Sequence, residues 1–243
     1  MKTRILVNGA AGKMGVIACE ALENHPDFEL VARCNRQDNL TFAINDTQAQ
    51  AVIDLTEPAS VLANTMAILE AKARPIIGTT GLTESQISDL SSQCDIQKIG
   101  CIIAPNFSIG ALLLMHCAQQ IARLMPECEI IESHHPQKKD APSGTSLKTA
   151  ALICEARQGV ASSARAGNPL ALGYTDAQVP IHSIRLPGIL ADETVIFGNT
   201  GETLSIAHQT LSRDAFKPGI LLACGHIMTL NRLVYGLEGL LFG

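Results

Sequence analysis

The sequence predicts an α/β fold: a Rossmann-like, doubly wound parallel sheet with a second α+β domain built on a mainly antiparallel sheet. Three observations indicate this fold. Short β-branched and aliphatic runs alternate with helical patterns through the first half of the chain. A glycine-rich turn follows the first of these runs. Past the middle of the chain, strand-like runs follow one another without helices between them, which favours antiparallel pairing.

The first unit of the pattern is typical of dinucleotide binding. Residues 4–8 form a β-rich run, Gly9, Gly12 and Gly15 are spaced G-x-x-G-x-x-G, and a helix over 16–23 and a strand over 28–34 follow. Glycines allow the tight turn and the close approach of a pyrophosphate to the helix N-terminus. An ordinary strand-to-helix turn has the same spacing, but the position after the first strand favours a cofactor site.

The alternation then continues in order. We expect strands over 51–55, 75–77 and 99–104, with helices over 59–71 and 109–124. Thr83 and Gln86 form a capping-box pattern that opens another helix. Ligands of doubly wound sheets lie at the carboxyl ends of the strands, where residues 9–15, 78–81 and 104–108 fall.

The window from Glu132 to Thr145 joins a half-buried strand over 128–132 to a helix over 145–156. Free amides at such a helix start favour an anion, and the histidines and lysines of the window add protonatable groups. The residues alone indicate an anion site with a proton donor beside it. A solvated surface loop with a turn is the competing interpretation.

The last part of the chain has a different composition and a different pattern of elements. Residues 158–178 are rich in Gly, Ala and Ser and predict a long loop or lid. Strands are expected over 181–186, 194–197 and 203–208, the last two as a hairpin, and a helix over 217–235. We expect a dinucleotide-binding domain over 1–106, a substrate-binding and oligomerisation domain over 107–213, and a C-terminal helix within 214–243 that returns to the first domain.

Composition narrows the classes of function. The chain has 243 residues, 47% of them hydrophobic and 17% charged, with a net charge of -5. It has no basic block, which argues against a nucleic-acid partner. Eight cysteines without a C-x-x-C unit fit reduced thiols. With neither a signal-peptide pattern nor an apolar run long enough for a bilayer, we expect a soluble cytoplasmic protein without a membrane partner.

Taken together, the motifs resemble one family. They are Gly9-Ala-Ala-Gly-Lys-Met-Gly15, Gly78-Thr-Thr-Gly81, Ala104-Pro-Asn-Phe-Ser108, His134-His-x-x-Lys-x-Asp-Ala-Pro-Ser-Gly-Thr145, Gly201-Glu-Thr-Leu204 and Ser212-Arg213. In this order they resemble 4-hydroxy-tetrahydrodipicolinate reductase, also called dihydrodipicolinate reductase. The resemblance implies an oxidoreductase of diaminopimelate and lysine biosynthesis. It implies reduction of a cyclic dicarboxylate, 4-hydroxy-tetrahydrodipicolinate, to tetrahydrodipicolinate by hydride transfer from NAD(P)H with loss of water. It also implies a homotetramer.

The resemblance assigns roles to individual residues. His134 is implied as the general acid and Lys138 as the second catalytic residue, which binds a substrate carboxylate. The implied substrate-binding residues are His135, Ser143, Gly144 and Thr145. The implied cofactor-binding residues are Gly9, Gly12, Lys13, Met14 and Gly15 at the pyrophosphate and ribose, Gly78, Thr80, Ala104, Asn106 and Phe107 at the nicotinamide, and Arg213 from the other domain. A core position for Phe107 and a helix cap for Arg213 are the alternatives.

Cofactor preference is predicted from the end of the second strand. NAD-preferring Rossmann sites carry Asp or Glu there, bonded to the ribose 2′-hydroxyl, whereas this chain has Asn35 followed by Arg36. An uncharged Asn35 removes repulsion, and Arg36 with Lys13 supplies positive charge for a 2′-phosphate. We expect NADPH to be preferred, with NADH also used. Asp38 is an alternative source of the missing carboxylate.

Two other classes of function compete with this interpretation. A non-catalytic NAD(P)-binding redox sensor would use the same first domain but has no need of the His134–Thr145 window. A zinc hydrolase would use His134 and His135 as ligands. Adjacent histidines rarely bind one ion, and the sequence has no H-x-x-x-H spacing, so we expect no metal site.

Overall fold

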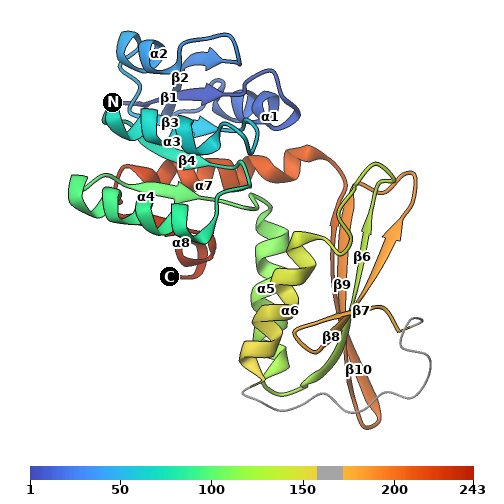
Figure 1. Ribbon diagram of the computed structural model, residues 1–243. Coiled ribbons are helices and arrows are strands. Elements are labelled where there is room, and N and C mark those ends of the chain that lie inside the picture. The colour runs from blue at the N-terminus through green and yellow to red at the C-terminus, as the bar shows by residue number, and fades with distance from the viewer. Residues whose placement is uncertain (158–171) are drawn as a thin grey trace. The chain divides into compact units, whose positions relative to one another are not determined.

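The computed structural model describes residues 1–157 and 172–243. The chain divides into two compact units. The first consists of Met1–Ser108 together with Phe216–Gly243, and the second of Ile109–Ala215. Each unit has its own sheet (Figure 1).

The first unit is built on a six-stranded sheet in the order β11-β5-β4-β3-β1-β2, and each neighbouring pair is parallel. The strands are β1 (Thr3–Asn8), β2 (Phe28–Cys34), β3 (Ala51–Asp54), β4 (Arg74–Ile77), β5 (Cys101–Ile103) and β11 (Leu233–Tyr235). The helices are α1 (Lys13–Leu22), α2 (Leu40–Asp46), α3 (Val61–Glu70), α4 (Glu84–Gln97), α7 (Lys217–Ile227) and α8 (Glu238–Phe242). This arrangement confirms the predicted Rossmann-like sheet.

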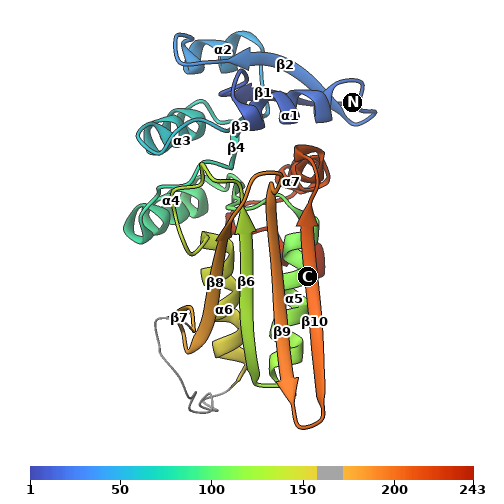
Figure 2. The same cartoon turned by 90° about the vertical axis from the view of Figure 1, so that its right-hand side faces the viewer.

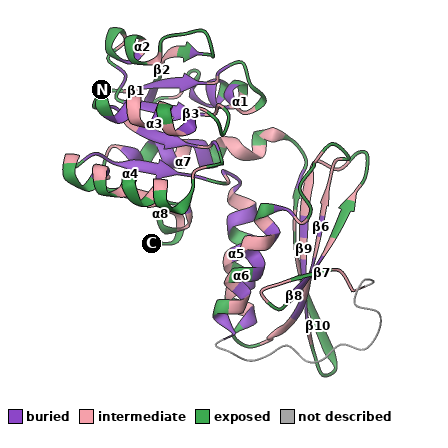
Figure 3. Cartoon of the chain, in the orientation of Figure 1, coloured by how far each residue is buried: buried purple, intermediate pink, exposed green. Residues whose placement is uncertain are grey.

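The central strands of this sheet are buried along most of their length, as Figure 3 shows. All four residues of β3 are buried, and so are Ile5 to Asn8 of β1. A parallel sheet with helices on both faces needs apolar side chains on both sides, which explains the unbroken aliphatic runs. The predicted capping box is also present: Thr83 Oγ1 accepts from the Gln86 amide at 3.3 Å, and Gln86 Oε1 accepts from the Thr83 amide at 2.9 Å.

Two elements of the first unit differ from the sequence prediction. The helix expected over 217–235 ends at Ile227, and Leu233–Tyr235 instead forms β11, which pairs with β5 at the edge of the sheet. That pairing is a tertiary contact which the helical pattern of the neighbouring residues conceals. The short helix α2 was not predicted, although Asn39 caps it by accepting from the Phe42 amide at 3.0 Å.

The second unit is built on a five-stranded sheet in the order β10-β9-β6-β8-β7. Its strands are β6 (Glu127–His134), β7 (Tyr174–Asp176), β8 (Val179–Arg185), β9 (Ala191–Asn199) and β10 (Glu202–Thr210). Its helices are α5 (Ile109–Ala122) and α6 (Gly144–Ala156), and a short 3-10 helix begins at Arg213. Of the pairs in this sheet, β6 with β8 is parallel and the others are antiparallel, which confirms the mainly antiparallel prediction.

Helices α5 and α6 lie together on one face of this sheet (Figure 2). The inward residues of β6 and β9, such as Cys128, Ile130, Val195 and Phe197, pack with the helices in one core. Because strand side chains alternate between faces, the same register places Glu132 and Glu193 on the helix side, and both are buried.

The loop or lid predicted over 158–178 falls mostly on residues 158–171, which lie outside the described residues. Within the remainder, residues 174–176 form β7, antiparallel to β8. Among the helices that the structure describes, none is long and apolar enough to span a membrane.

Candidate active site

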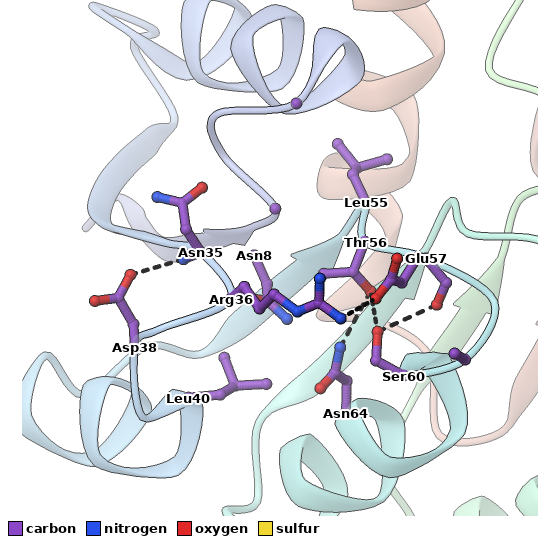
Figure 4. Close-up of a pocket in the computed structure, with 13 residues that line it drawn as sticks. Asn8, Asn35, Arg36, Asp38, Leu40, Leu55, Thr56, Glu57, Ser60 and Asn64 are labelled. Carbon is purple, nitrogen blue, oxygen red and sulfur yellow. Dashed lines mark hydrogen bonds and ion pairs between the residues drawn. The ribbon is translucent and has the colours of Figure 1, made fainter.

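A cavity of about 520 Å³ lies in the first unit, at the carboxyl ends of β1 and β3. The chain leaves β1 towards β2 on one side and later returns as β3 on the other, so this is the switch point at which such sheets bind ligands. Figure 4 shows the polar side chains around it. Four of the predicted cofactor residues line the cavity, and they are Gly9, Gly12, Asn35 and Arg36.

The glycine turn beside this cavity has no room for a side chain at Gly9 or Gly15. A Cβ on Gly15 would lie 2.1 Å from the carbonyl oxygen of Gly9, and a Cβ on Gly9 would lie 2.6 Å from that of Leu55. Gly12 precedes α1 and has no side chain to cap it. The first-turn amides of Lys13, Met14 and Gly15 therefore stay available as donors for a pyrophosphate, which is the fit that a dinucleotide requires.

The end of β2 is tied to the glycine turn by hydrogen bonds. Asn35 Oδ1 accepts from the Ala11 amide at 2.8 Å, and Asp38 Oδ2 accepts from the Asn35 amide at 2.7 Å. Arg36 forms an ion pair with Glu57 at 3.2 Å, and both side chains are exposed. Asn35 thus shapes the turn, while Arg36 carries an exposed positive charge at the rim of the cavity (Figure 4).

A buried carboxylate that was not among the predicted site residues is hydrogen-bonded to side chains that line this cavity. Asp54, at the end of β3, is fully buried. Its Oδ2 accepts from Asn8 at 2.9 Å and from Asn64 at 2.8 Å. Its Oδ1 accepts from the hydroxyl of Thr56 at 2.7 Å and from that of Thr79 at 3.0 Å. These bonds join the ends of β1 and β3 to the segment that follows β4.

The residues predicted at the nicotinamide fall after β4 and β5. A Cβ on Gly78 would lie 2.5 Å from Leu55 Cδ2 and 2.6 Å from Phe107 Cε2, so these three residues are in close contact. Phe107 is 4% exposed, in keeping with a core position. Thr80 is exposed and Ala104 is buried. Asn106 Oδ1 accepts from the Ser108 amide at 2.8 Å. Arg213 belongs to the second unit.

In the second unit, His134 at the end of β6 is held by a buried carboxylate. Its Nδ1 lies 2.5 Å from Oε2 of Glu132, two residues earlier on the same face of the strand. Arg185 of β8 donates to both oxygens of Glu132, at 2.9 and 3.0 Å. Neither Glu132 nor Arg185 was among the predicted site residues. A charged residue in phase with the buried positions of β6 was the signal for Glu132.

Opposing effects act on the pKa values of Glu132 and His134. Burial alone would raise the pKa of Glu132, but hydrogen bonds from Arg185, Ser183 and His134 together lower it. Burial lowers the pKa of His134, and the positive charges of Lys138 and Arg185 lower it further, while Glu132 acts in the opposite direction.

Lys138 belongs to the same network. Its ammonium lies 2.7 Å from Oδ2 of Asp140, and Arg185 donates to the carbonyl oxygen of Asp140 at 2.7 Å. The hydrogen bond from Lys138 lowers the pKa of Asp140. The neighbouring His135 has its Nδ1 3.2 Å from Oε1 of Gln137, in the loop after β6. The structure therefore gathers His134 and Lys138 around the guanidinium of Arg185.

The predicted anion site is the start of α6. Ser143 is the N-cap, and its buried Oγ accepts from the Ser146 amide at 3.1 Å. The Ser143 hydroxyl is thus engaged in capping. A Cβ on Gly144 would meet no atom within 4 Å, so the helix start is open beside it. Thr145 is half-buried. Within residues 1–157 and 172–243, no three His, Cys, Asp or Glu side chains are arranged to hold a metal ion.

Comparison with known proteins gives the family. The model of the dihydrodipicolinate reductase N-terminus matches residues 3–107, and that of the dihydrodipicolinate reductase C-terminus matches residues 110–241. The 4-hydroxy-tetrahydrodipicolinate reductase of Legionella pneumophila is 54% identical, over 99% of this chain and 100% of its own length. That of Coxiella burnetii is 48% identical over the same shares.

Solved structures agree with these matches. The dipicolinate-bound dihydrodipicolinate reductase of Paenisporosarcina sp. TG-14 has a TM-score of 0.90 and 36% identity, covering 98% of this chain and 99% of that one. GenD2 from gentamicin A biosynthesis, solved in complex with NAD, has a TM-score of 0.64 at 12% identity and shows the fold alone. The chain is therefore an oxidoreductase, and it belongs to the dihydrodipicolinate reductase family.

Proposed function

We propose that this enzyme reduces 4-hydroxy-tetrahydrodipicolinate to tetrahydrodipicolinate, with hydride from NAD(P)H and loss of water, in diaminopimelate and lysine biosynthesis. One observation carries the proposal: His134 is fixed through Nδ1 by Glu132 and shares one network with Lys138, and the start of α6, which follows that network in the chain, is open at Gly144. A histidine held in this way can donate a proton, while a lysine and free helix amides suit a substrate with two carboxylates.

The proton steps follow from the geometry around His134. Its Nδ1 faces the carboxylate of Glu132, so the proton on Nδ1 stays in that hydrogen bond. The proton that His134 delivers to the substrate is then the one on Nε2. Lys138 neutralises one substrate carboxylate and the charge that develops beside it. His135 and the amides of Ser143, Gly144 and Thr145 bind the other carboxylate.

The first unit holds the cofactor. The pyrophosphate and ribose would be held along Gly9, Gly12, Lys13, Met14 and Gly15, and the nicotinamide near Gly78, Thr80, Ala104, Asn106 and Phe107, with Arg213 as a further cofactor-binding residue. When bound, the reduced nicotinamide supplies the hydride. The steric limits at Gly9 and Gly15 and the uncapped start of α1 support this placement.

NADPH is the preferred cofactor in this proposal, with NADH also accepted. Asn35 has no negative charge to repel a 2′-phosphate, and it is already bonded to the Ala11 amide. Arg36 and Lys13 are exposed cations at this end of the first unit. Asp38, the alternative carboxylate, has its Oδ2 engaged by the Asn35 amide.

A homotetramer built through the second sheet is also proposed. The sheet face opposite α5 and α6 presents Ile131, Thr194 and Ile196, and Ile184 is 43% exposed on the same face. Another copy of this sheet would bury these side chains. Sedimentation at micromolar concentration tests this assembly, and a stable monomer would refute it. The eight cysteines are all free, which supports a reducing compartment, the cytoplasm.

The test of the reaction is NADPH oxidation, followed with the hydroxylated substrate generated enzymatically in the same assay and repeated with NADH. We expect turnover in the wild-type enzyme and a loss of about 100-fold or more in kcat for His134→Gln, with cofactor affinity unchanged. Full activity in His134→Gln would refute the acid role. Cofactor binding without turnover in the wild type would favour the redox sensor instead.

A further inference from the structure

Glu193 is a buried acid that the proposed reaction does not use. It lies on β9 directly opposite Glu132 of β6, and 6% of its surface is exposed. Its carboxyl group contacts two hydroxyls of α6, with Ser146 Oγ 2.7 Å from Oε2 and Thr149 Oγ1 2.6 Å from Oε1. Among the residues that the structure describes, these hydroxyls are its hydrogen-bond partners. Within residues 1–157 and 172–243, no cation is hydrogen-bonded to Glu193 as Arg185 is to Glu132.

The hydrogen atoms of this cluster can be counted. Thr149 Oγ1 also lies 3.0 Å from the carbonyl oxygen of Thr145. A hydroxyl has one proton and cannot donate to both that carbonyl and Glu193. If Oε1 of Glu193 is protonated and donates to Thr149, then Thr149 donates to Thr145, and each oxygen has a suitable partner.

The other half of the cluster leads to the helix cap. Ser146 donates to Oε2 of Glu193, and the Ser143 hydroxyl, 2.8 Å from Ser146 Oγ, donates to Ser146. Ser143 then keeps its acceptor lone pairs for the Ser146 amide, which it caps at 3.1 Å. A continuous chain of hydrogen bonds therefore runs from β9 to the N-cap of α6.

The opposite carboxylate makes a second negative charge costly here. Glu132 is bonded on both oxygens by Arg185 and is the ionised member of the pair. Burial raises the pKa of Glu193 despite the two hydroxyls, and the charge of Glu132 raises it further. An ionised Glu193 would also repel a substrate carboxylate at the start of α6.

We propose that Glu193, as a neutral acid, is a positioning residue for the substrate-carboxylate site. It ties the first two turns of α6 to β9 through Ser146 and Thr149 and so holds the amides of Ser143, Gly144 and Thr145 in place for the anion. Glu193 does not touch the substrate. The inference rests on the proposed function, because it assigns the start of α6 to that substrate.

Glu193→Gln and Glu193→Ala separate the parts of this inference. Glutamine reproduces the neutral acid, since its NH₂ group donates to Thr149 and its oxygen accepts from Ser146. We expect the substrate KM of Glu193→Gln to stay within about twofold of wild type. Glu193→Ala leaves two buried hydroxyls without their partner and is expected to raise the substrate KM about tenfold, with the NADPH KM unchanged. Inhibition by dipicolinate should weaken in parallel.

Three further variants complete the experiment. Ser146→Ala and Thr149→Val remove the partners of Glu193 one at a time, and each should raise the substrate KM several-fold, so the test stands even if Glu193→Ala folds poorly. Glu155→Ala is the matched control, because Glu155 is an exposed carboxylate on the same helix, and we expect its KM values to equal those of wild type.

The outcomes are distinct. Equal effects of Glu193→Gln and Glu193→Ala would overturn the neutral-acid role. Variants that lose stability while the substrate KM and the NADPH KM change together would show a merely structural role and overturn the inference. A wild-type enzyme that neither turns over the substrate nor binds dipicolinate would refute the proposed function, and the inference with it.

Discussion

The Nδ1 atom of His134 lies 2.5 Å from Oε2 of Glu132, and Arg185 donates hydrogen bonds to both oxygens of the same carboxylate. The imidazole of His134 is therefore oriented by a carboxylate that is itself fixed. The pKa of His134 depends on two opposing sets of effects. Burial and the neighbouring cations favour the neutral ring, and Glu132 favours the charged one.

Replacing Glu132 should disturb that balance in a known direction. In Glu132→Gln the pKa of His134 falls further, because burial and the charges of Lys138 and Arg185 remain while the carboxylate is lost. A general acid works in its protonated form, so the descending limb of the kcat/KM profile against pH moves to lower pH. We expect a loss of at least about tenfold in kcat/KM at neutral pH. A descending limb that stays in place would contradict this role, and Glu155→Gln serves as the control.

Glu132 should also contribute to the pH dependence of stability. Its folded-state pKa lies below the ordinary value of 4.5, so its contribution to the free energy of unfolding is complete above that pH. The contribution is lost as the pH falls through the lower folded-state pKa. Urea unfolding should show the largest difference between wild type and Glu132→Gln near neutral pH, and the difference should shrink below pH 4.5. A constant difference would exclude this linkage.

We expect the ion pair of Arg36 and Glu57 to affect the preference for NADPH over NADH. Arg36→Gln removes a cation for the 2′-phosphate and should lower the ratio of kcat/KM for NADPH to that for NADH by about tenfold. Glu57→Gln releases Arg36 from its ion pair and removes a nearby negative charge, so the same ratio should rise. Comparable kcat/KM values for the two cofactors in the wild type, or a preference for NADH, would refute the predicted preference.

Gly15→Ala tests the cofactor site by steric exclusion. A Cβ at Gly15 would lie 2.1 Å from the Gly9 carbonyl oxygen, so the glycine turn must shift. We expect the affinity for NADPH, measured by fluorescence titration, to fall at least about tenfold, while dipicolinate still binds. Val16→Ala, at the next and exposed position, should bind NADPH as the wild type does. Unchanged affinity in Gly15→Ala would place the pyrophosphate elsewhere.

The features that the sequence predicted are those set by local patterns. The alternation of aliphatic strands with helices predicted the parallel sheet, and the capping box at Thr83 predicted where α4 begins. The motifs and their order along the chain indicated the family. Each of these depends on residues a few positions apart, where periodicity and capping chemistry act directly.

The features that it missed depend on contacts between distant residues. Glu132 and Arg185 are 53 positions apart, and the parallel register of β6 with β8 brings them together. Asp54 and Asn8 meet across 46 positions in the same way. Strand β11 has three residues, too few to show a period, and its pairing with β5 decides its conformation.

The buried carboxylate of Asp54 has a thermodynamic consequence for cofactor binding. Asn8, Thr56 and Asn64, which line the cavity, and Thr79 are all hydrogen-bonded to it, so these side chains are held in place before any ligand arrives. Binding then restricts few groups there, and the loss of conformational entropy falls on the exposed side chains at the rim. Affinity should therefore depend mainly on the exposed charged side chains that line the cavity, such as Arg36 and Glu57, while the hydrogen-bonded side chains keep the same arrangement for both cofactors.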